Sequence, residues 1–194
     1  MRSSDILPGM SVSALREITI GVSDLQARRG QFQTGCGLSS LSSGPIDSMT
    51  AGRLFDAGST LGATLMGRPD VADSPRVRLV QSGAPEPARP HGLRSPGPLG
   101  VGFTTRGIAE VHARLAAEGV RFVSPPVLLT PVPATGSAPG PRRFECFGRA
   151  EDGDFVVLIE RVNATTAYGT LVTDCSEPLH ASFVVTNLEA SRTS

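Results

Sequence analysis

The chain has 194 residues, of which 39% are hydrophobic and 19% charged, so it can bury a core and is not disordered throughout. Its 18 basic residues balance 18 acidic residues, which argues against nucleic-acid binding through a basic surface. Every basic residue is arginine, and the absence of lysine excludes Schiff-base chemistry and a Walker-type phosphate site.

Residues 15–22 alternate apolar and polar side chains, which predicts a half-buried strand. Ser23 and Asp24 then provide N-cap chemistry for a short helix that ends near Gly35. A connection rich in glycine and serine follows. After it we expect strands over 50–56, 62–66 and 77–81, and a proline-rich surface linker over 82–98.

The same order of elements then begins again. Residues 99–105 predict a strand, and 108–118 predict a helix that ends at Gly119. Residues 120–129 read as extended, and 130–141 as a loop rich in proline and glycine. Strands are expected over 143–148 and 155–162, and a third start is visible at 179–186. A unit of strand, helix and several strands therefore recurs about every 80 residues.

Signals for export and for disulfides are absent from the sequence. No apolar run reaches the roughly 18 residues of a membrane helix, and residues 1–13 lack the pattern of a secretory signal. Cys36, Cys146 and Cys175 are an odd number at wide spacings, which fits neither a disulfide framework nor a zinc motif. We therefore expect buried or half-buried thiols and a cytoplasmic protein.

Three segments resemble the vicinal oxygen chelate superfamily, which includes glyoxalases, bleomycin-resistance proteins and extradiol dioxygenases. They are EITIGVSDL at 17–25, GVGFTT at 100–105 with IAEVHARLAAEGV at 108–120, and EDGDFVVLIE at 151–160. The resemblance implies an α+β fold: two βαβββ modules form a cup-shaped mixed sheet with helices outside. We expect an arm over 1–13, a domain over 14–165 with modules 14–82 and 99–165 and linker 83–98, and a tail over 166–194 that starts a third module.

The resemblance also locates the metal-ligand positions of the superfamily, which fall on Glu17, Arg78, Gly100 and Val157. A divalent metal needs about three or four converging oxygen, nitrogen or sulfur donors, and this set supplies one carboxylate. We therefore expect no metal and no cofactor. His180 stands where the first-strand ligand of the third module would stand, and the alternative is that it is incidental.

Glu17 and Arg78 would face each other in the cup, where a bidentate ion pair would occupy the space of a metal. One interpretation is a polar anchor for an anionic or carbonyl-bearing ligand. The other is a structural pair, or two separate surface residues if the strand register differs by one.

Other residues complete the expected ligand-contacting set or are alternatives to it. Gly100 and Gly102 leave room on the strand face turned away from the helix, for a ligand or for close packing, and Val157 and Phe147 line the same cup. Arg142 and Arg143 either steer an anion or are solvated. His112 is expected on a helix surface, and Glu145 and Glu160 on the rim.

The leading hypothesis for function is a metal-free domain that binds a small molecule, anionic or carbonyl-bearing, and forms a homodimer without nucleic acid or membrane partners. The alternative is an enzyme of secondary metabolism or aromatic degradation: a lyase, isomerase or ring-cleaving dioxygenase. It would use Glu17 as a base, or a metal site beyond Ser194. A third possibility is the structural half of a larger protein. A drug-sequestering role is disfavoured, because stacking on planar drugs needs aromatic walls and the chain has no tryptophan and one tyrosine.

Overall fold

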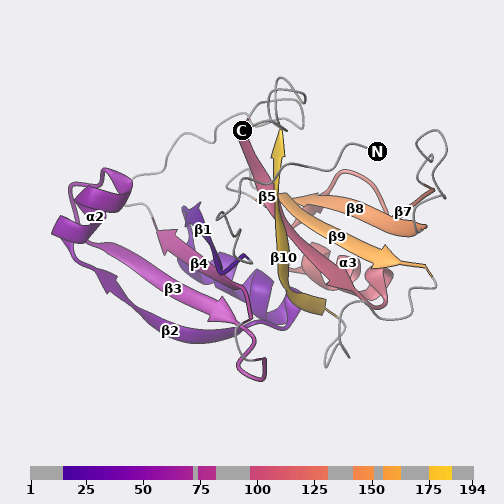
Figure 1. Cartoon of the computed structure of the whole chain (residues 1–194), viewed down its shortest axis with the longest axis horizontal. Helices are drawn as coiled ribbons and strands as arrows, with labels where there is room; N and C mark the ends of the chain where they lie inside the picture. Colours follow the sequence, from indigo (N-terminus) through magenta and orange to yellow (C-terminus); the bar gives the residue numbers. More distant parts are fainter. Residues whose placement is uncertain are drawn as a thin grey trace, which may run out of the picture.

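The computed structural model describes residues 15–71, 74–81, 97–130, 142–150, 155–162 and 175–184. The first module runs in the order β1 (Glu17–Val22), α1 (Leu25–Gly30), β2 (Ser39–Ile46), α2 (Ser48–Phe55), β3 (Leu61–Gly67) and β4 (Arg76–Gln81). Its strands form sheet A in the order β1-β4-β3-β2, with β1 and β4 parallel and the other neighbours antiparallel (Figure 1).

The second module repeats this arrangement. It contains β5 (Gly97–Thr105), α3 (Ile108–Ala117), β6 (Arg121–Phe122), β7 (Val127–Leu129), β8 (Arg143–Arg149) and β9 (Phe155–Arg161), followed by β10 (Cys175–Val184). Sheet B has the order β10-β5-β9-β8-β6, and β7 also pairs with β8. The parallel pair β5–β9 corresponds to β1–β4 of the first module, so the recurrence in the sequence is confirmed as a structural repeat. No helix in the described part of the chain is long and apolar enough to cross a membrane.

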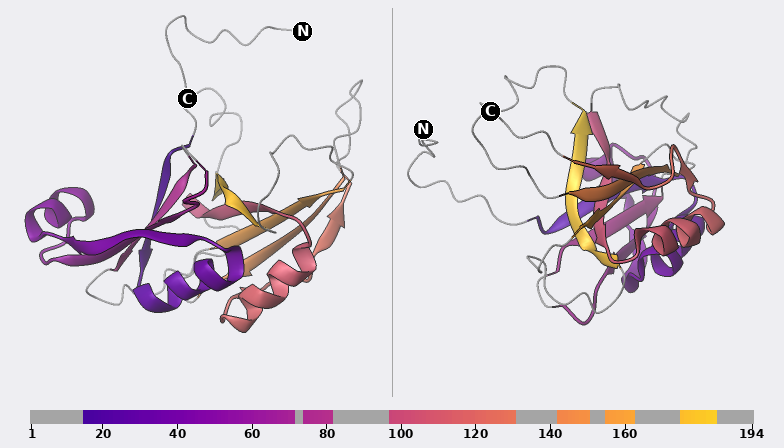
Figure 2. Two further views of the ribbon diagram at one scale, coloured as in Figure 1. Left: turned by 90° about the horizontal axis from the view of Figure 1, so that it is seen from below. Right: turned by 90° about the vertical axis from the view of Figure 1, so that its right-hand side faces the viewer.

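One apolar core joins the two modules. It contains Ile20 and Val22 of β1 and Val77 and Leu79 of β4, together with residues of β5, α3, β8, β9 and β10. The alternation predicted for residues 15–22 explains this arrangement, because every second side chain of a strand points to the same face of its sheet. Helices α1 and α3 lie side by side against these apolar faces (Figure 2).

The two helices approach each other closely at Gly35, which ends a π-helical turn continuing α1 over Gln31–Gly35. A Cβ atom at Gly35 would lie 2.3 Å from Leu115 Cδ2 and 2.7 Å from Leu115 Cγ. Arg114 Nη2 donates to the Gly35 carbonyl at 3.2 Å, and Gln31 Nε2 donates to the Glu118 carbonyl at 3.1 Å. The absence of a side chain at Gly35 therefore allows the helices of the two modules to pack directly.

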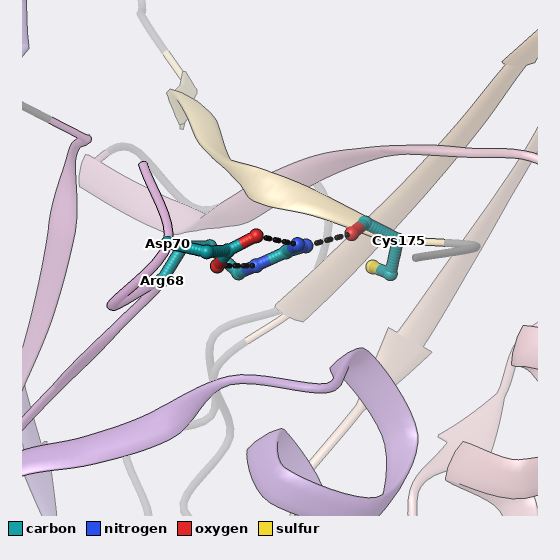
Figure 3. Close-up of polar contacts among 3 residues, drawn as sticks. All are labelled: Arg68, Asp70 and Cys175. Carbon is teal, nitrogen blue, oxygen red and sulfur yellow. Dashed lines mark hydrogen bonds and ion pairs between the residues drawn. The ribbon is translucent and has the colours of Figure 1, made fainter. Parts of the chain in front are cut away.

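Strand β10 is held beside β5 by a buried arginine that follows β3. Arg68 donates from Nη1 to the Cys175 carbonyl at 3.0 Å, and from Nε and Nη2 to the two carboxylate oxygens of Asp70 at 3.1 and 3.0 Å (Figure 3). These bonds from Arg68 hold the pKa of Asp70 below its usual value. Ser176 Oγ also accepts a bond from the Thr104 amide at 2.9 Å. The segment expected to start a third module at 179–186 therefore forms strand β10 of sheet B, which begins at Cys175 rather than at 179.

The fold corrects two predictions in the first module. The connection after Gly35 contains β2, and residues 48–55 form helix α2 rather than a strand over 50–56. Strand β2 is an edge strand whose residues are exposed except for Ile46. Because neither of its faces is buried, serines stand where a half-buried strand would alternate apolar and polar residues. Asp47 caps α2 by accepting bonds from the amide and hydroxyl of Thr50. The arm over 1–13, most of the linker and the loop over 131–141 lie outside the described residues.

Gly35→Ala is expected to lower the free energy of unfolding by about 1–3 kcal/mol, because Leu115 is fully buried and cannot move aside without disturbing the core. Gly44→Ala is the matched control, since no atom lies within 4 Å of a Cβ at that position, and it should change stability by about 0.5 kcal/mol or less. Urea denaturation measures both. Equal effects of the two substitutions would show that the close approach of the helices does not limit packing.

Candidate functional site

The face of sheet A opposite the helices is polar along β1 and β4. Glu17 pairs in register with Arg76, and Thr19 pairs with Arg78. Neighbouring register partners share a face, whereas Ile18, Ile20, Val77 and Leu79 point to the core. We call Glu17, Thr19, Arg76 and Arg78 the polar face of sheet A.

Glu17 and Arg78 form a bidentate ion pair on this face. Arg78 Nε donates to Glu17 Oε1 at 2.6 Å, and Arg78 Nη2 donates to Glu17 Oε2 at 3.0 Å. The side chains are 35% and 33% exposed, so the pair is half-buried at the surface of the sheet. The hydrogen bonds that Arg78 donates to Glu17 raise the pKa of Arg78 above its already high value, which burial only partly opposes.

This geometry limits the chemistry available to Glu17. Both carboxylate oxygens accept a bond from the same guanidinium, so a proton taken up by Glu17 would break one of the two bonds. The guanidinium keeps its Nη1 amino group outside the pair. The arrangement therefore suits hydrogen bonding to an oxygen of a ligand better than proton abstraction.

The other predicted site residues lie on sheet B, apart from this pair. Gly102, Val157 and Phe147 form one row across β5, β9 and β8, and Gly100 lies one row further along β5. Val157 is 1% exposed and Gly102 is buried, whereas Phe147 and Gly100 are half-buried. The expectation that Gly102 leaves an uncovered patch is wrong, because Gly102 is buried. Strand β10 pairs with β5 along its edge, in the plane of the sheet.

The residues at the four positions where the resemblance locates metal ligands do not fit a divalent metal. Glu17 is the single oxygen donor among the side chains there, and it is held by Arg78, while Gly100 and Val157 provide no donor. Elsewhere in the described ranges, no group of three or more His, Cys, Asp and Glu residues is arranged to hold a metal ion. The backbone of His180, the residue expected at a ligand position of a third module, pairs with Gly102 of β5.

Two residues expected at the surface or rim have structural roles instead. Glu160 is not a rim residue, because its Oε2 accepts the Ile108 amide at 2.7 Å and caps the start of α3. His112 is half-buried, with its ring 4.0 Å from that of Phe122. All three cysteines are buried and free, and burial together with the charge of Glu145 raises the pKa of Cys146 to about 12.

Sheet B also has a polar face, and most of its charged residues were not singled out from the sequence. They are Arg121 of β6, Arg143, Glu145 and Arg149 of β8, and Arg161 of β9. We call these five residues the charged face of sheet B. The alternation in the sequence 143–149 (RFECFGR) already indicates that Arg143, Glu145 and Arg149 share a side. The positions of Arg121 and Arg161 depend on strand pairing, which the sequence does not reveal.

Solved structures with a similar fold include glyoxalase-type proteins. A glyoxalase family protein from Bacillus cereus aligns with a TM-score of 0.63 at 22% identity, covering 80% of this chain and 99% of its own. Glyoxalase I from Zea mays gives 0.57 at 16% identity over 92% of this chain and 52% of its own. A glyoxylase/bleomycin resistance protein/dioxygenase domain from a Frankia species gives 0.51 at 14% identity over 78% of this chain and 100% of its own.

No family model matches the sequence, and no curated protein matches it. The structural matches, together with two repeated modules in mixed sheets, show that the chain has the vicinal oxygen chelate fold. The chain spans about half the length of the maize enzyme and nearly the whole of the other two proteins. At these identities the likeness establishes the fold, and the chemistry must be argued from the residues.

A double-mutant cycle of Glu17→Met and Arg78→Met is expected to give a coupling of up to about 1 kcal/mol in the free energy of unfolding, as for exposed bidentate pairs. Each single variant leaves one charge unpaired, so the double variant should be more stable than the sum of the two losses. The control cycle combines Glu17→Met with Arg76→Met. The coupling between these two substitutions should be smaller, because the side chain of Arg76 makes no hydrogen bond to Glu17. Additive single effects at Glu17 and Arg78 would contradict the pairing.

Proposed function

We propose that the protein is a metal-free domain that binds a small molecule on the polar face of sheet A. The observation that carries the proposal is the Glu17–Arg78 pair, which occupies two of the positions where the resemblance locates metal ligands. A guanidinium can replace a cation as a partner for oxygen ligands, because it is permanently charged and donates directional hydrogen bonds.

The geometry of the pair supports an anionic or carbonyl-bearing ligand. Arg78 uses Nε and Nη2 for Glu17, and Nη1 is left to donate to a carboxylate or carbonyl oxygen. Thr19, the register partner of Arg78, contributes a neighbouring hydroxyl on the same face. The expected ligand-contacting residues of sheet B also belong to the proposal, although Gly102 and Val157 are buried and only Gly100 and Phe147 among them are half-buried.

The second candidate is an enzyme of the lyase, isomerase or dioxygenase type. It is supported by the register of His180, which stands beside β5 at the ligand position of a third module. The occupied carboxylate oxygens of Glu17 weigh against its use as a base, so this candidate depends on residues other than Glu17. Recovery of a bound probe unchanged after incubation distinguishes binding from turnover.

We further propose that the protein is a homodimer in the cytoplasm. Exposed apolar side chains on α2 and on the edge strand β7 support association, with Met49 73%, Leu54 67% and Val127 45% exposed.

A bleomycin-sequestering role is less well supported. In the row formed by Gly102, Val157 and Phe147 on sheet B, Phe147 alone has an aromatic ring on which a planar drug could stack.

The proposed function predicts binding of pyruvate, which carries a carboxylate and a carbonyl. In an amide NMR titration, shifts should concentrate at β1 and β4, and they should disappear in the double variant Glu17→Met with Arg78→Met. That variant should stay folded, since no unpaired charge remains. Arg53→Gln, an exposed residue of α2, is the control and should bind like the unmodified protein. Unchanged binding by a folded double variant would refute the assignment of this site.

A further inference from the structure

The polar face of sheet A has a second arginine beside the Glu17–Arg78 pair. Arg76 of β4 is the register partner of Glu17 and precedes Arg78 by two residues, so both arginines lie on the same face of the strand. Arg76 is exposed, and its side chain has no hydrogen bond or ion pair within the part of the chain that the structure describes. Because Glu17 is held by Arg78, the guanidinium of Arg76 is the cation of this face that can pair with an anion.

Apolar side chains lie next to the two arginines, on the side of β4 away from Glu17. Leu65 of β3 is the register partner of Arg78, so it shares the face of the arginines. Leu41 of β2 reaches over Gly67, where a Cβ atom would lie 3.0 Å from Leu41 Cδ1 and 3.4 Å from Arg76 Cγ. The absence of a side chain at Gly67 therefore brings Leu41 close to the methylene stem of Arg76. We call Leu41 and Leu65 the apolar strip of sheet A.

The exposed face of sheet A thus changes from charged to apolar in the order of its strands. Strands β1 and β4 carry the polar face, and β3 and β2 carry the apolar strip (Figure 1). Leu41 is 36% exposed and Leu65 is half-buried, so a ligand can cover more of both side chains. The strip extends about 10 Å from β4 to β2, since neighbouring strands lie about 4.8 Å apart. An acidic group at the arginines would place an attached hydrocarbon chain along it.

We propose that this surface binds aliphatic monocarboxylates, with the carboxylate at Arg76 and Arg78 and the hydrocarbon chain over the apolar strip. The inference rests on the proposed function and adds the class of ligand. Arg78 donates through Nη1, the amino group outside its pair with Glu17, and Arg76 supplies the charge that balances the carboxylate. A chain of about eight carbon atoms reaches from β4 to β2, and a longer one gains nothing because β2 is the edge of the sheet.

Amide NMR titrations with butanoate, hexanoate, octanoate and decanoate test the proposal. Each added methylene should tighten binding about two- to fourfold up to octanoate, as its partial to full burial predicts, and decanoate should bind no more tightly. The shifts should extend from β1 and β4 to β3 and β2. Octan-1-ol, which has the chain without the charge, should bind about tenfold or more weakly than octanoate.

Substitutions separate the contribution of the charge from that of the strip. Arg76→Gln should weaken butanoate and octanoate by the same factor of about five or more. Leu41→Ser, at an exposed position of a serine-rich strand, should weaken octanoate about fivefold and leave butanoate unchanged. Leu54→Ser is the matched control on α2, where the side chain is 67% exposed, and should change neither. Ser42→Leu, at the register partner of Leu65, should tighten octanoate binding.

Equal affinities for butanoate and octanoate, with the pyruvate response at β1 and β4 intact, would overturn the aliphatic ligand class and leave the proposed function in place. Equal losses of octanoate binding in Leu41→Ser and Leu54→Ser would also overturn it, because they would indicate unspecific association with apolar surface. Absence of any response to pyruvate would contradict the proposed function itself, and this inference with it.

Discussion

The two modules share one apolar core, and the close approach of their helices at Gly35 and Leu115 makes this possible. Both sheets must turn one face toward that core, because α1 and α3 lie on the same side of them. The alternation of side chains along each strand then determines what the opposite faces carry. On β1 and β4 the result is Glu17 beside Arg78, and on β8 and β9 it is Arg143 opposite Arg161. The charged groups are thus a consequence of the register that the core imposes.

The same constraint decides which side chains the strands of this fold present at the positions where the resemblance locates metal ligands. The vicinal oxygen chelate fold brings the first and last strands of each module together, as β1 with β4 and β5 with β9. In this chain those strands present an ion pair in the first module and Gly100 and Val157 in the second. We propose that the Arg78 guanidinium takes the place of metal ligands as the group that attracts a ligand's oxygen atoms. Strand β10, fastened by Arg68 to the Cys175 carbonyl, closes the free edge of β5 between the sheets (Figures 1 and 3).

Much of this could be predicted from the sequence where the signal is local. The alternation at 15–22, the Asp24 cap and the helix over 108–118 are confirmed, because each depends on neighbouring residues. The predictions for the segments that form β2 and α2 were wrong. An exposed, serine-rich edge strand shows no alternation of apolar and polar residues, and α2 buries only Ala51, so neither has the pattern by which its structure is recognised. The Glu17–Arg78 contact followed from the resemblance, whereas Arg161 opposite Arg143, and Arg68 beneath β10, depend on pairings between distant segments.

Metal content tests the central claim most directly: the cup positions hold an ion pair where a metal would otherwise bind. The purified protein would be incubated in turn with zinc, nickel, manganese and ferrous iron, dialysed, and measured by mass spectrometry for metal per chain. The donor set predicts far less than one equivalent for every metal, with no difference between the unmodified protein and Glu17→Gln. One equivalent of any of these metals, lost in Glu17→Gln, would contradict the account and return Glu17 to the role of a metal ligand.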